Sequence, residues 1–297
     1  MIANMQNNAS TQFYEMIPFA EYLYTPFEKN YDATSSLEFA QNHMALPWII
    51  TGSYLLACWM GTIYMNRHHN ERFDLKYPLV YWNAGLSFFS YMGAMRTVPE
   101  LLYRVSMETT LTDTICRNPS ATWGTGASGF WVQLFVFSKI PELIDTAFIV
   151  ARKRPLLFLH WYHHVTVLLY CWHSFATQAP QALYFVAMNY SVHAIMYGYY
   201  CLMALKMKPA WMSPFVITAA QITQMMVGMT VQMASSYKYL MDNNSCNMNG
   251  FNIAAGGAMY TSYFALFAKF ALDRYYKPLP NAKESSLKSK IDKLKSV

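Results

Sequence analysis

The chain has 297 residues, of which 54% are hydrophobic, 17% are aromatic and only 13% are charged. A soluble domain typically carries about 25% charged residues, so this composition argues against an ordinary soluble protein and favours a large apolar body. The net charge of +6 would suit a nucleic-acid partner, but the basic residues gather in particular loops, which indicates membrane topology and no nucleic acid.

Seven apolar segments of roughly bilayer-spanning length follow one another along the chain. They cover residues 46–65, 78–95, 128–150, 156–173, 180–205, 211–234 and 252–273. The sequence predicts an all-α, polytopic membrane protein whose seven transmembrane helices form one catalytic domain, residues 46–273. An amphipathic N-terminal arm, residues 1–45, and a basic tail, residues 274–297, flank it. The N-terminus has no basic region followed by an apolar core, so we expect no cleaved signal peptide.

The third segment contains SKIPELIDT, an unusual concentration of polar residues for a span. Lys139, Glu142, Asp145 and Thr146 have the spacing of one helix face. The simplest interpretation is a self-neutralising cluster with Lys139 paired to Glu142, because unpaired charges in hydrocarbon are costly. Pro141 should also kink the helix. So much polarity beside a kink favours a functional site.

The fourth segment contains HWYHH, in which His160, His163 and His164 are spaced i, i+3 and i+4. This spacing puts the three imidazoles on one helix face. A lone buried histidine is usually a hydrogen-bonded core residue. Three on one face of a membrane span predict a functional site.

The fifth and sixth segments carry polar stripes of their own. The stripes are Asn189, His193, Tyr197 and Tyr200 in the fifth segment, and Thr218, Gln221 and Gln224 in the sixth. Tyrosines in a span are often packing residues, and glutamines can hold helices together. The functional interpretation of these stripes therefore rests mainly on His193 and Asn189.

The distribution of Lys and Arg predicts the orientation. With the N-terminus in the lumen, fifteen basic residues fall on the cytosolic side and five on the lumenal side, while Lys139 and Lys269 lie inside spans. The positive-inside rule therefore predicts a lumenal arm and a cytosolic tail.

Three further signals agree with this orientation. Cys116 and Cys246 fall in lumenal loops, where an oxidising compartment would allow a disulfide. Asn8 and Asn243 lie in N-x-S sequons on the same side and are predicted glycosylation sites. The tail ends in KLKSV, where Lys293 and Lys295 have the spacing of an address for retrieval to the endoplasmic reticulum. The alternative is a solvated lysine-rich tail.

The polar faces fall at similar depths in the predicted bundle. Only ARKRP joins segments three and four, so both of their clusters lie in the cytosolic half. His193, Gln221 and Gln224 fall near the midplane at about 1.5 Å of rise per residue. We expect one active-site tunnel with a cytosolic mouth. A basic rim there would suit a phosphorylated ligand; its members are Arg152, Lys153, Arg154, Lys206 and Lys208.

Two chemistries fit clustered histidines. The His-x-x-His-His pattern resembles one box of membrane di-iron desaturases, but those enzymes need more histidines than the spans hold here, so we expect no di-iron site; a single metal site stays open. Imidazole can instead act as a general base or nucleophile in acyl transfer. An apolar tunnel would hold a fatty chain, the basic rim would meet the phosphates of coenzyme A, and Lys139 or a glutamine would stabilise an oxyanion. Cys171, two turns beyond His164, is interpreted as packing.

The motifs KIPELIDT, HWYHH, NYSVHAIMYGYY and TAAQITQ occur in this order, after FEKNYDA in the arm. On seven segments, this series resembles the ELO family of very-long-chain fatty acid elongases, the membrane 3-ketoacyl-CoA synthases. Within that family the sequence is most similar to the branch that extends saturated chains of about palmitoyl length. Branched-chain substrates are an alternative.

The resemblance implies that an acyl-CoA condenses with malonyl-CoA, giving 3-ketoacyl-CoA, carbon dioxide and coenzyme A, in the endoplasmic reticulum membrane and without a tightly bound cofactor. We expect His163 to hold the chain as an acyl-imidazole and His193 to handle protons or orient the thioester. The implied supporting set is Lys139, Glu142 and Asp145 for electrostatics, and Asn189, Gln221, Gln224, Tyr197, Tyr200 and Thr146 for substrate binding. Phe88, Phe130 and Phe185 are candidates for setting chain length. The resemblance also implies a homodimer and association with a ketoacyl-CoA reductase, a dehydratase and an enoyl reductase.

Three rival classes remain. A seven-helix receptor would leave the histidines beside Lys139, Glu142 and Asp145 unexplained. A transporter should show paired half-repeats with short, broken spans, which the sequence lacks. A desaturase-like or hydroxylase-like metal enzyme would need bound iron.

Overall fold

The computed structural model describes residues 11–17, 19–69, 71–107, 110–241 and 248–276. The regular structure in these ranges is helical, with no strand and only an isolated bridge between Asp32 and Thr125. The predicted all-α class is therefore confirmed.

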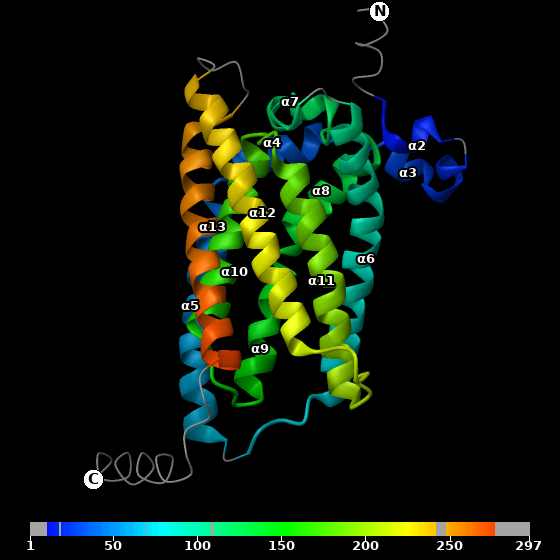
Figure 1. Cartoon of the computed structure of the whole chain (residues 1–297). Coiled ribbons are helices and arrows are strands. Elements are labelled where there is room, and N and C mark those ends of the chain that lie inside the picture. The colour runs from blue at the N-terminus through cyan, green and yellow to red at the C-terminus, as the bar shows by residue number, and fades with distance from the viewer. Residues whose placement is uncertain (1–10, 18, 70, 108–109, 242–247, 277–297) are drawn as a thin grey trace, which may run out of the picture.

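Seven rods in the described ranges run between the two ends of the molecule (Figure 1). They are α5 Leu46–His68, α6 Lys76–Met107, the pair α8 Gly126–Ser138 and α9 Ile144–Ala151, α10 Phe158–Ala176, α11 Ala182–Leu205, α12 Pro214–Met241 and α13 Gly250–Ala271. Successive rods alternate in direction. We name the end that holds the connections after α5, α9 and α11 the basic end, and the opposite end the arm end.

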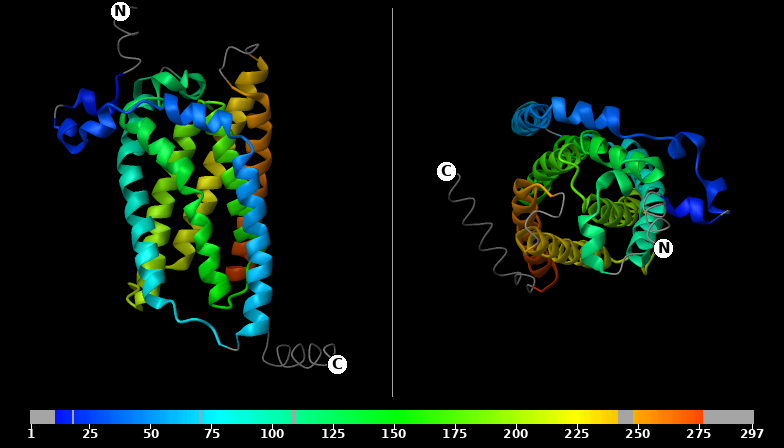
Figure 2. Two further views of the ribbon diagram at one scale, coloured as in Figure 1. Left: turned by 180° about the vertical axis from the view of Figure 1, so that it is seen from behind. Right: turned by 90° about the horizontal axis from the view of Figure 1, so that it is seen from above.

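The rods form a ring rather than a solid bundle (Figure 2). Neighbouring members pack in the order α6, α11, α12, α13, α10 and then α8, which returns to α6. Helix α5 lies outside this ring against α9 and α10. A ring of this kind leaves room for an internal site, and side chains decide how much of it stays open.

Two rods differ from the predicted segments. The predicted span 78–95 continues to Met107 in α6, because Glu100 and Arg104 pair across one helical turn at 2.7 Å and both are buried. The predicted span 128–150 is broken into α8 and α9 by a 3₁₀ turn, η3 Pro141–Leu143. Pro141 was expected to kink this helix; because proline lacks the N–H that the ladder requires, it ends the helix instead.

Length and mean hydropathy alone identify two described helices, α5 and α12, as candidate membrane spans. The third rod fails such a test because neither α8 nor α9 is long enough by itself. The mean hydropathy of α10 is lowered by its histidines and other polar side chains, and three of these histidines face the interior of the ring. The prediction of seven spans therefore stays a prediction.

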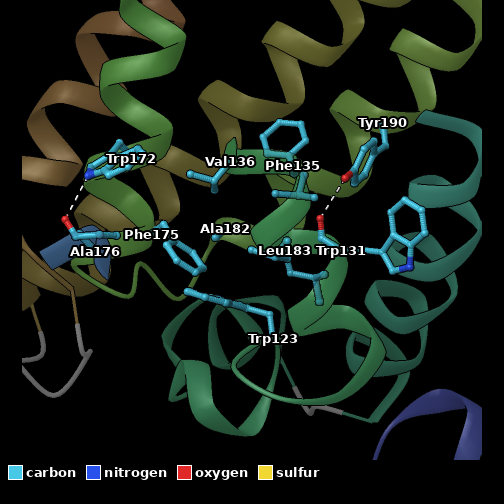
Figure 3. Packing of buried hydrophobic residues seen from close by; sticks show 13 residues of the cluster. Trp123, Trp131, Phe135, Val136, Trp172, Phe175, Ala176, Ala182, Leu183 and Tyr190 are labelled. Carbon is cyan, nitrogen blue, oxygen red and sulfur yellow. Dashed lines mark hydrogen bonds between the residues drawn. The ribbon is translucent and has the colours of Figure 1, made fainter. Parts of the chain in front are cut away.

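A dense aromatic core closes the ring toward the arm end (Figure 3). Trp123 and Trp172 are fully buried, and Trp131 and Tyr190 lie beside them. Three of these residues also bind backbone. The indoles of Trp123 and Trp172 donate to the carbonyls of Ala179 at 3.2 Å and Ala40 at 3.1 Å, and the Tyr190 hydroxyl donates to the Trp131 carbonyl at 2.9 Å. These bonds satisfy the polar tips of large buried rings.

The described part of the arm is a chain of short helices, α2 Phe13–Met16, η1 Ala20–Leu23, α3 Pro26–Lys29 and α4 Thr34–Asn42. Glu28 fixes it to the ring, because one carboxylate oxygen accepts hydrogen bonds from the Trp131 indole at 2.6 Å and from Arg96 Nε at 3.1 Å. The other oxygen accepts from the Thr25 amide at 2.8 Å. Gly126 adopts a φ of +63°, and the Gln12 side chain fills the space that the Cβ atom of any other residue at this position would need.

The cysteine and tail predictions are only partly within the described residues. Cys116, at the end of α7 Leu111–Cys116, is disulfide-bonded, while Cys58, Cys171 and Cys201 are free. The expected partner Cys246 lies outside the described residues, as do Asn8, Asn243, Lys293 and Lys295. The predicted pairing with Cys246, the glycosylation sites and the retrieval address stay predictions.

Replacing Glu28 with Gln should loosen the arm and lower the thermal midpoint of the purified protein by about 5 °C, since a hydrogen bond to a charged group is worth roughly 1.5–3 kcal/mol. Burial works to raise the pKa of the Glu28 carboxyl, but hydrogen bonds from Trp131 and Thr25 and the Arg96 charge hold it below its ordinary value.

The lowered pKa of Glu28 determines how the stability of the protein changes with pH. A depressed pKa adds stability above the pKa of the unfolded chain, and this stability is lost as pH falls through the folded-state pKa. The wild-type midpoint should therefore drop on acidification below pH about 4.5 more steeply than that of Glu28→Gln. Parallel melting curves for the two proteins across that range would refute this role of Glu28.

Candidate active site

Two of the cavities that the described residues form lie within the ring. The larger, of about 580 Å³, opens near the basic end. Its charged and polar lining comes from α6, from the stretch between η3 and the start of α10, and from α10 to α12, and apolar side chains complete it. The smaller, of about 50 Å³, is lined mainly by apolar and aromatic residues of α8, α10, α11 and α13. His163 is the one described residue that lines both cavities. A reacting group there would have polar surroundings on one side and an apolar slot on the other.

The histidine face of α10 follows the predicted spacing. Leu157 is extended and α10 begins at Phe158, so the three imidazoles stand in its first two turns. All three line the larger cavity. The ring centroids of His160 and His164 are 4.5 Å apart, and those of His163 and His164 are 5.6 Å apart. The ring nitrogens of His163 form no hydrogen bond with the described residues, whereas its backbone carbonyl accepts one from Tyr263 at 3.2 Å.

The break at Pro141 sends the polar side chains of the third rod in different directions. Lys139 Nζ and Glu142 Oε1 are 2.7 Å apart and both side chains are buried, so the predicted pairing of these two residues is confirmed. Ser138 donates to the same carboxylate oxygen at 2.9 Å, and Lys139 lies over the Phe135 ring. Glu142 lines the larger cavity but Lys139 does not.

Asp145 is held by side chains from two other rods. Its Oδ1 accepts from the Trp82 indole of α6 at 2.5 Å, and its Oδ2 accepts from the Tyr197 hydroxyl of α11 at 2.7 Å. The rings of Tyr197 and His193 are 5.4 Å apart, centroid to centroid. The carboxylate therefore positions the Tyr197 ring beside His193 in the cavity wall.

Thr146 and Tyr54 support His160. The Thr146 hydroxyl lies 2.9 Å from His160 Nε2 and 2.8 Å from the Tyr54 hydroxyl. Both Thr146 and Tyr54 are buried. The peripheral helix α5 thus reaches the histidine face through this hydroxyl pair, and the Tyr54 ring also lies 6.3 Å from the His164 ring, centroid to centroid.

The polar stripes of α11 and α12 divide between the cavities. His193, Tyr197, Tyr200 and Gln221 line the larger cavity, and Asn189 and Gln224 line the smaller. The Oδ1 atom of Asn189 is buried and has no hydrogen-bond partner among the described residues. Because an unpaired buried acceptor is costly, Asn189 is poised to bind a donor in that cavity.

The basic rim is smaller than predicted. Arg152 and Arg154 line the larger cavity, but Lys153, Lys206 and Lys208 do not. Lys153 adopts a left-handed conformation as the chain leaves α9, and its ammonium donates to the His69 carbonyl instead. Lys206 and Lys208 are exposed on the connection between α11 and α12. Two arginines, rather than five cations, therefore lie at the cavity.

Some residues that support the site were not predicted, and some predicted residues lie elsewhere. Trp82 and Tyr54, which hydrogen-bond Asp145 and Thr146, were missed because aromatic residues in apolar spans carry no distinct sequence signal. Phe88 is 67% exposed on the outer face of α6, and Phe130 packs against the arm residues Phe27 and Tyr31. Of the three phenylalanines considered for chain length, only Phe185 lines the smaller cavity. Cys171, interpreted as packing, lines it too. In the described chain, no group of three or more His, Cys, Asp or Glu side chains is arranged to hold a metal ion.

Comparison with known proteins places this arrangement in context. The sequence pattern of the ELO family, described as GNS1/SUR4, matches residues 39–283. The chain is 43% identical to very long chain fatty acid elongase 6 of Drosophila melanogaster, over 76% of this chain and 71% of the relative. It is 38% identical to the Gallus gallus protein of that name and 36% identical to the Homo sapiens one, in both cases over 84% of this chain and 91% of the relative.

Replacing Lys139 with Met should destabilise the protein by about 3–5 kcal/mol, because it leaves the Glu142 carboxylate buried without its cation. The double variant Lys139→Met, Glu142→Gln should recover much of that loss, since it removes both charges. Thermal unfolding of the purified proteins measures both effects, with Lys206→Met as the exposed-lysine control. A double variant less stable than the single one would contradict the buried pair.

Proposed function

Because the chain belongs to the ELO (GNS1/SUR4) family, we propose that it elongates fatty acids as a membrane 3-ketoacyl-CoA synthase (3-oxoacyl-CoA synthase). In this reaction a long-chain acyl-CoA condenses with malonyl-CoA to give 3-ketoacyl-CoA, carbon dioxide and coenzyme A. The observation that carries the proposal is the position of His163, which lines both the polar and the apolar cavity. An acyl group attached there has its carbonyl among polar residues and its tail among apolar ones.

In the first proposed step, a ring nitrogen of His163 attacks the thioester carbon. The C–S bond breaks, the thiolate of coenzyme A leaves, and the acyl chain stays as an acyl-imidazole. The ring loses its N–H proton, which the departing thiolate takes up to give the free thiol. His193, in the wall of the same cavity, is our candidate for carrying this proton or for orienting the thioester.

In the second step, malonyl-CoA occupies the larger cavity and loses carbon dioxide, so that the electron pair of the broken C–C bond forms an enolate. The enolate carbon attacks the acyl-imidazole carbonyl, the C–N bond breaks, and 3-ketoacyl-CoA leaves. His163 regains a proton, so one proton is consumed in each cycle. The buried Glu142 and the partly buried Asp145 would keep this site electrostatically fixed, with Lys139 neutralising Glu142.

The remaining polar groups suit the two substrates. Arg152 and Arg154 lie where the phosphates of coenzyme A would enter, and Tyr200, Gln221 and Thr146 lie in or directly behind the cavity wall. Asn189 and Gln224 lie on the apolar side, beyond His163. No tightly bound cofactor or metal is part of this proposal.

The setting of the enzyme is proposed in the same way. We place residues 46–273 across the endoplasmic reticulum membrane as seven spans, with the arm (1–45) in the lumen and the tail (274–297) in the cytosol. The clustering of Arg152, Lys153 and Arg154 with Lys206 and Lys208 at the basic end supports this orientation. A homodimer, and association with the reductases and the dehydratase that complete a cycle of elongation, are further expectations.

Incubating the purified protein with an acyl-CoA alone should give a covalent adduct equal in mass to the acyl group. The His163→Ala variant should form none and should lose condensation activity by more than about 1,000-fold. Intact-mass measurement reads the adduct, and labelled malonyl-CoA reads 3-ketoacyl-CoA formation. Cys171→Ser is the matched control, because this free thiol lines the apolar cavity and would also accept an acyl group. An adduct that persists in His163→Ala and vanishes in Cys171→Ser would overturn the assignment.

Replacing Phe185 with Ala should enlarge the apolar cavity and shift the products toward longer chains by about one elongation cycle, because the removed side chain frees volume in its wall. Gas chromatography of the released fatty acids reads the shift. Phe88→Ala, on the outer face of α6, is the matched control and should leave the products unchanged. Equal product profiles for Phe185→Ala and wild type would show that this cavity does not hold the chain.

A further inference from the structure

Three hydroxyl and imidazole groups from three different helices form one relay that ends on the histidine face. Tyr54 of α5, Thr146 of α9 and His160 of α10 are joined by contacts of 2.8 Å and 2.9 Å. Tyr54 is 7% exposed and Thr146 is 2% exposed, so water is excluded from both. Helix α5 stands outside the ring, and this relay links it to the site.

The direction of the protons in the relay can be argued from the partners available. If Thr146 donates to His160 Nε2, then Tyr54 donates to Thr146 and every hydroxyl proton has a strong acceptor. In the opposite direction, His160 Nε2–H donates to Thr146 and Thr146 donates to Tyr54. The Tyr54 proton would then have to turn to the thiol of Cys58, its neighbour on α5. Sulfur is a weak acceptor, and a poorly satisfied buried hydroxyl is costly.

The preferred direction fixes the tautomer of His160. A neutral imidazole accepts with one nitrogen and donates with the other. With Nε2 accepting from Thr146, the proton of His160 sits on Nδ1, and no lone pair remains for attack on a carbonyl. His163, by contrast, has no hydrogen bond from its ring nitrogens to the described residues. The two neighbouring imidazoles are therefore chemically different.

We propose that Tyr54 and Thr146 are positioning residues that hold His160 as a hydrogen-bond donor in the larger cavity. This inference rests on the proposed function: the Nδ1–H of His160 stabilises the oxyanion that forms when His163 attacks the thioester. A donor held in place before the reaction costs no reorganisation during it, which is why such groups contribute strongly to catalysis. Holding one tautomer is itself valuable, because the wrong tautomer cannot donate.

Two substitutions interrupt the relay and two others serve as controls. Tyr54→Phe removes its first hydroxyl and Thr146→Val its second, with little change in volume. Thr146→Ser keeps the hydroxyl and is the conservative rescue. Thr51→Val is the matched control on α5, because the buried Thr51 hydroxyl binds only backbone carbonyls of its own helix.

The rate of coenzyme A release from acyl-CoA, without malonyl-CoA, isolates the first step. We expect Thr146→Val to lower this rate by about 10-fold to 100-fold, with the KM for acyl-CoA within about twofold of wild type. Tyr54→Phe should lower it by several-fold, and the double variant should be no slower than Thr146→Val alone. Thr146→Ser and Thr51→Val should react at about the wild-type rate. The covalent adduct should still reach its full amount in every variant, only later.

The outcomes separate this inference from the proposed function. If the wild type forms no adduct, the acyl-imidazole proposal fails. If the wild type forms the adduct and Thr146→Val forms it at the same rate, only the relay fails. Additive rate losses in the double variant, or thermal midpoints that fall while the rate per folded molecule is unchanged, would reduce the relay to a packing contact and overturn the inference.

Nitrogen NMR of ¹⁵N-histidine-labelled protein offers a direct second test, with the His160 signals assigned by their loss in His160→Gln. Nδ1 of His160 should show the shift of a protonated ring nitrogen in the wild type, and a mixture of tautomers in Thr146→Val. A protonated Nε2 in the wild type would contradict the proposed direction.

Discussion

The break at Pro141 is the constraint on which the rest of the site depends. A continuous helix would line up Lys139, Glu142, Asp145 and Thr146 on one face and bury two carboxylates beside each other. The 3₁₀ turn at Pro141–Leu143 separates them, so Glu142 meets Lys139, Asp145 meets α6 and α11, and Thr146 meets α10. Each charge then has a partner in a medium where an unpaired charge is very costly. The turn thus allows charged side chains to lie at the larger cavity although the surrounding helices are mostly apolar.

A second consequence is that neighbouring histidines have different surroundings and can therefore take different chemical roles. His160 is bound through Nε2 to Thr146, while His163 faces two cavities of opposite character. A nucleophile needs a free lone pair, and an oxyanion needs a donor, so one histidine type can supply both if its surroundings differ. Sequence spacing alone treats the two histidines alike. Their hydrogen-bond partners distinguish them.

Much of this architecture was predictable, for reasons that also explain the errors. The i, i+3, i+4 spacing placed the histidines on one face because helix geometry is independent of tertiary context. The end of α6 was missed because Glu100 and Arg104 resemble a polar loop until their mutual pairing is known. Lys153 was expected at the rim, but its left-handed backbone turns it toward His69. Tertiary partners decide such cases, and a single sequence does not contain them.

In this proposal, His163 lies between the larger cavity, where the thioester reacts, and the smaller cavity, which holds the fatty chain. The most direct measurement is an experimental structure of the protein after reaction with a long-chain acyl-CoA in the absence of malonyl-CoA. We expect continuous density from a ring nitrogen of His163 into the apolar cavity beside Phe185 and Cys171, with coenzyme A absent or at the basic end. Density joined to His160, His164 or Cys171, or a chain lying outside the ring, would contradict the account.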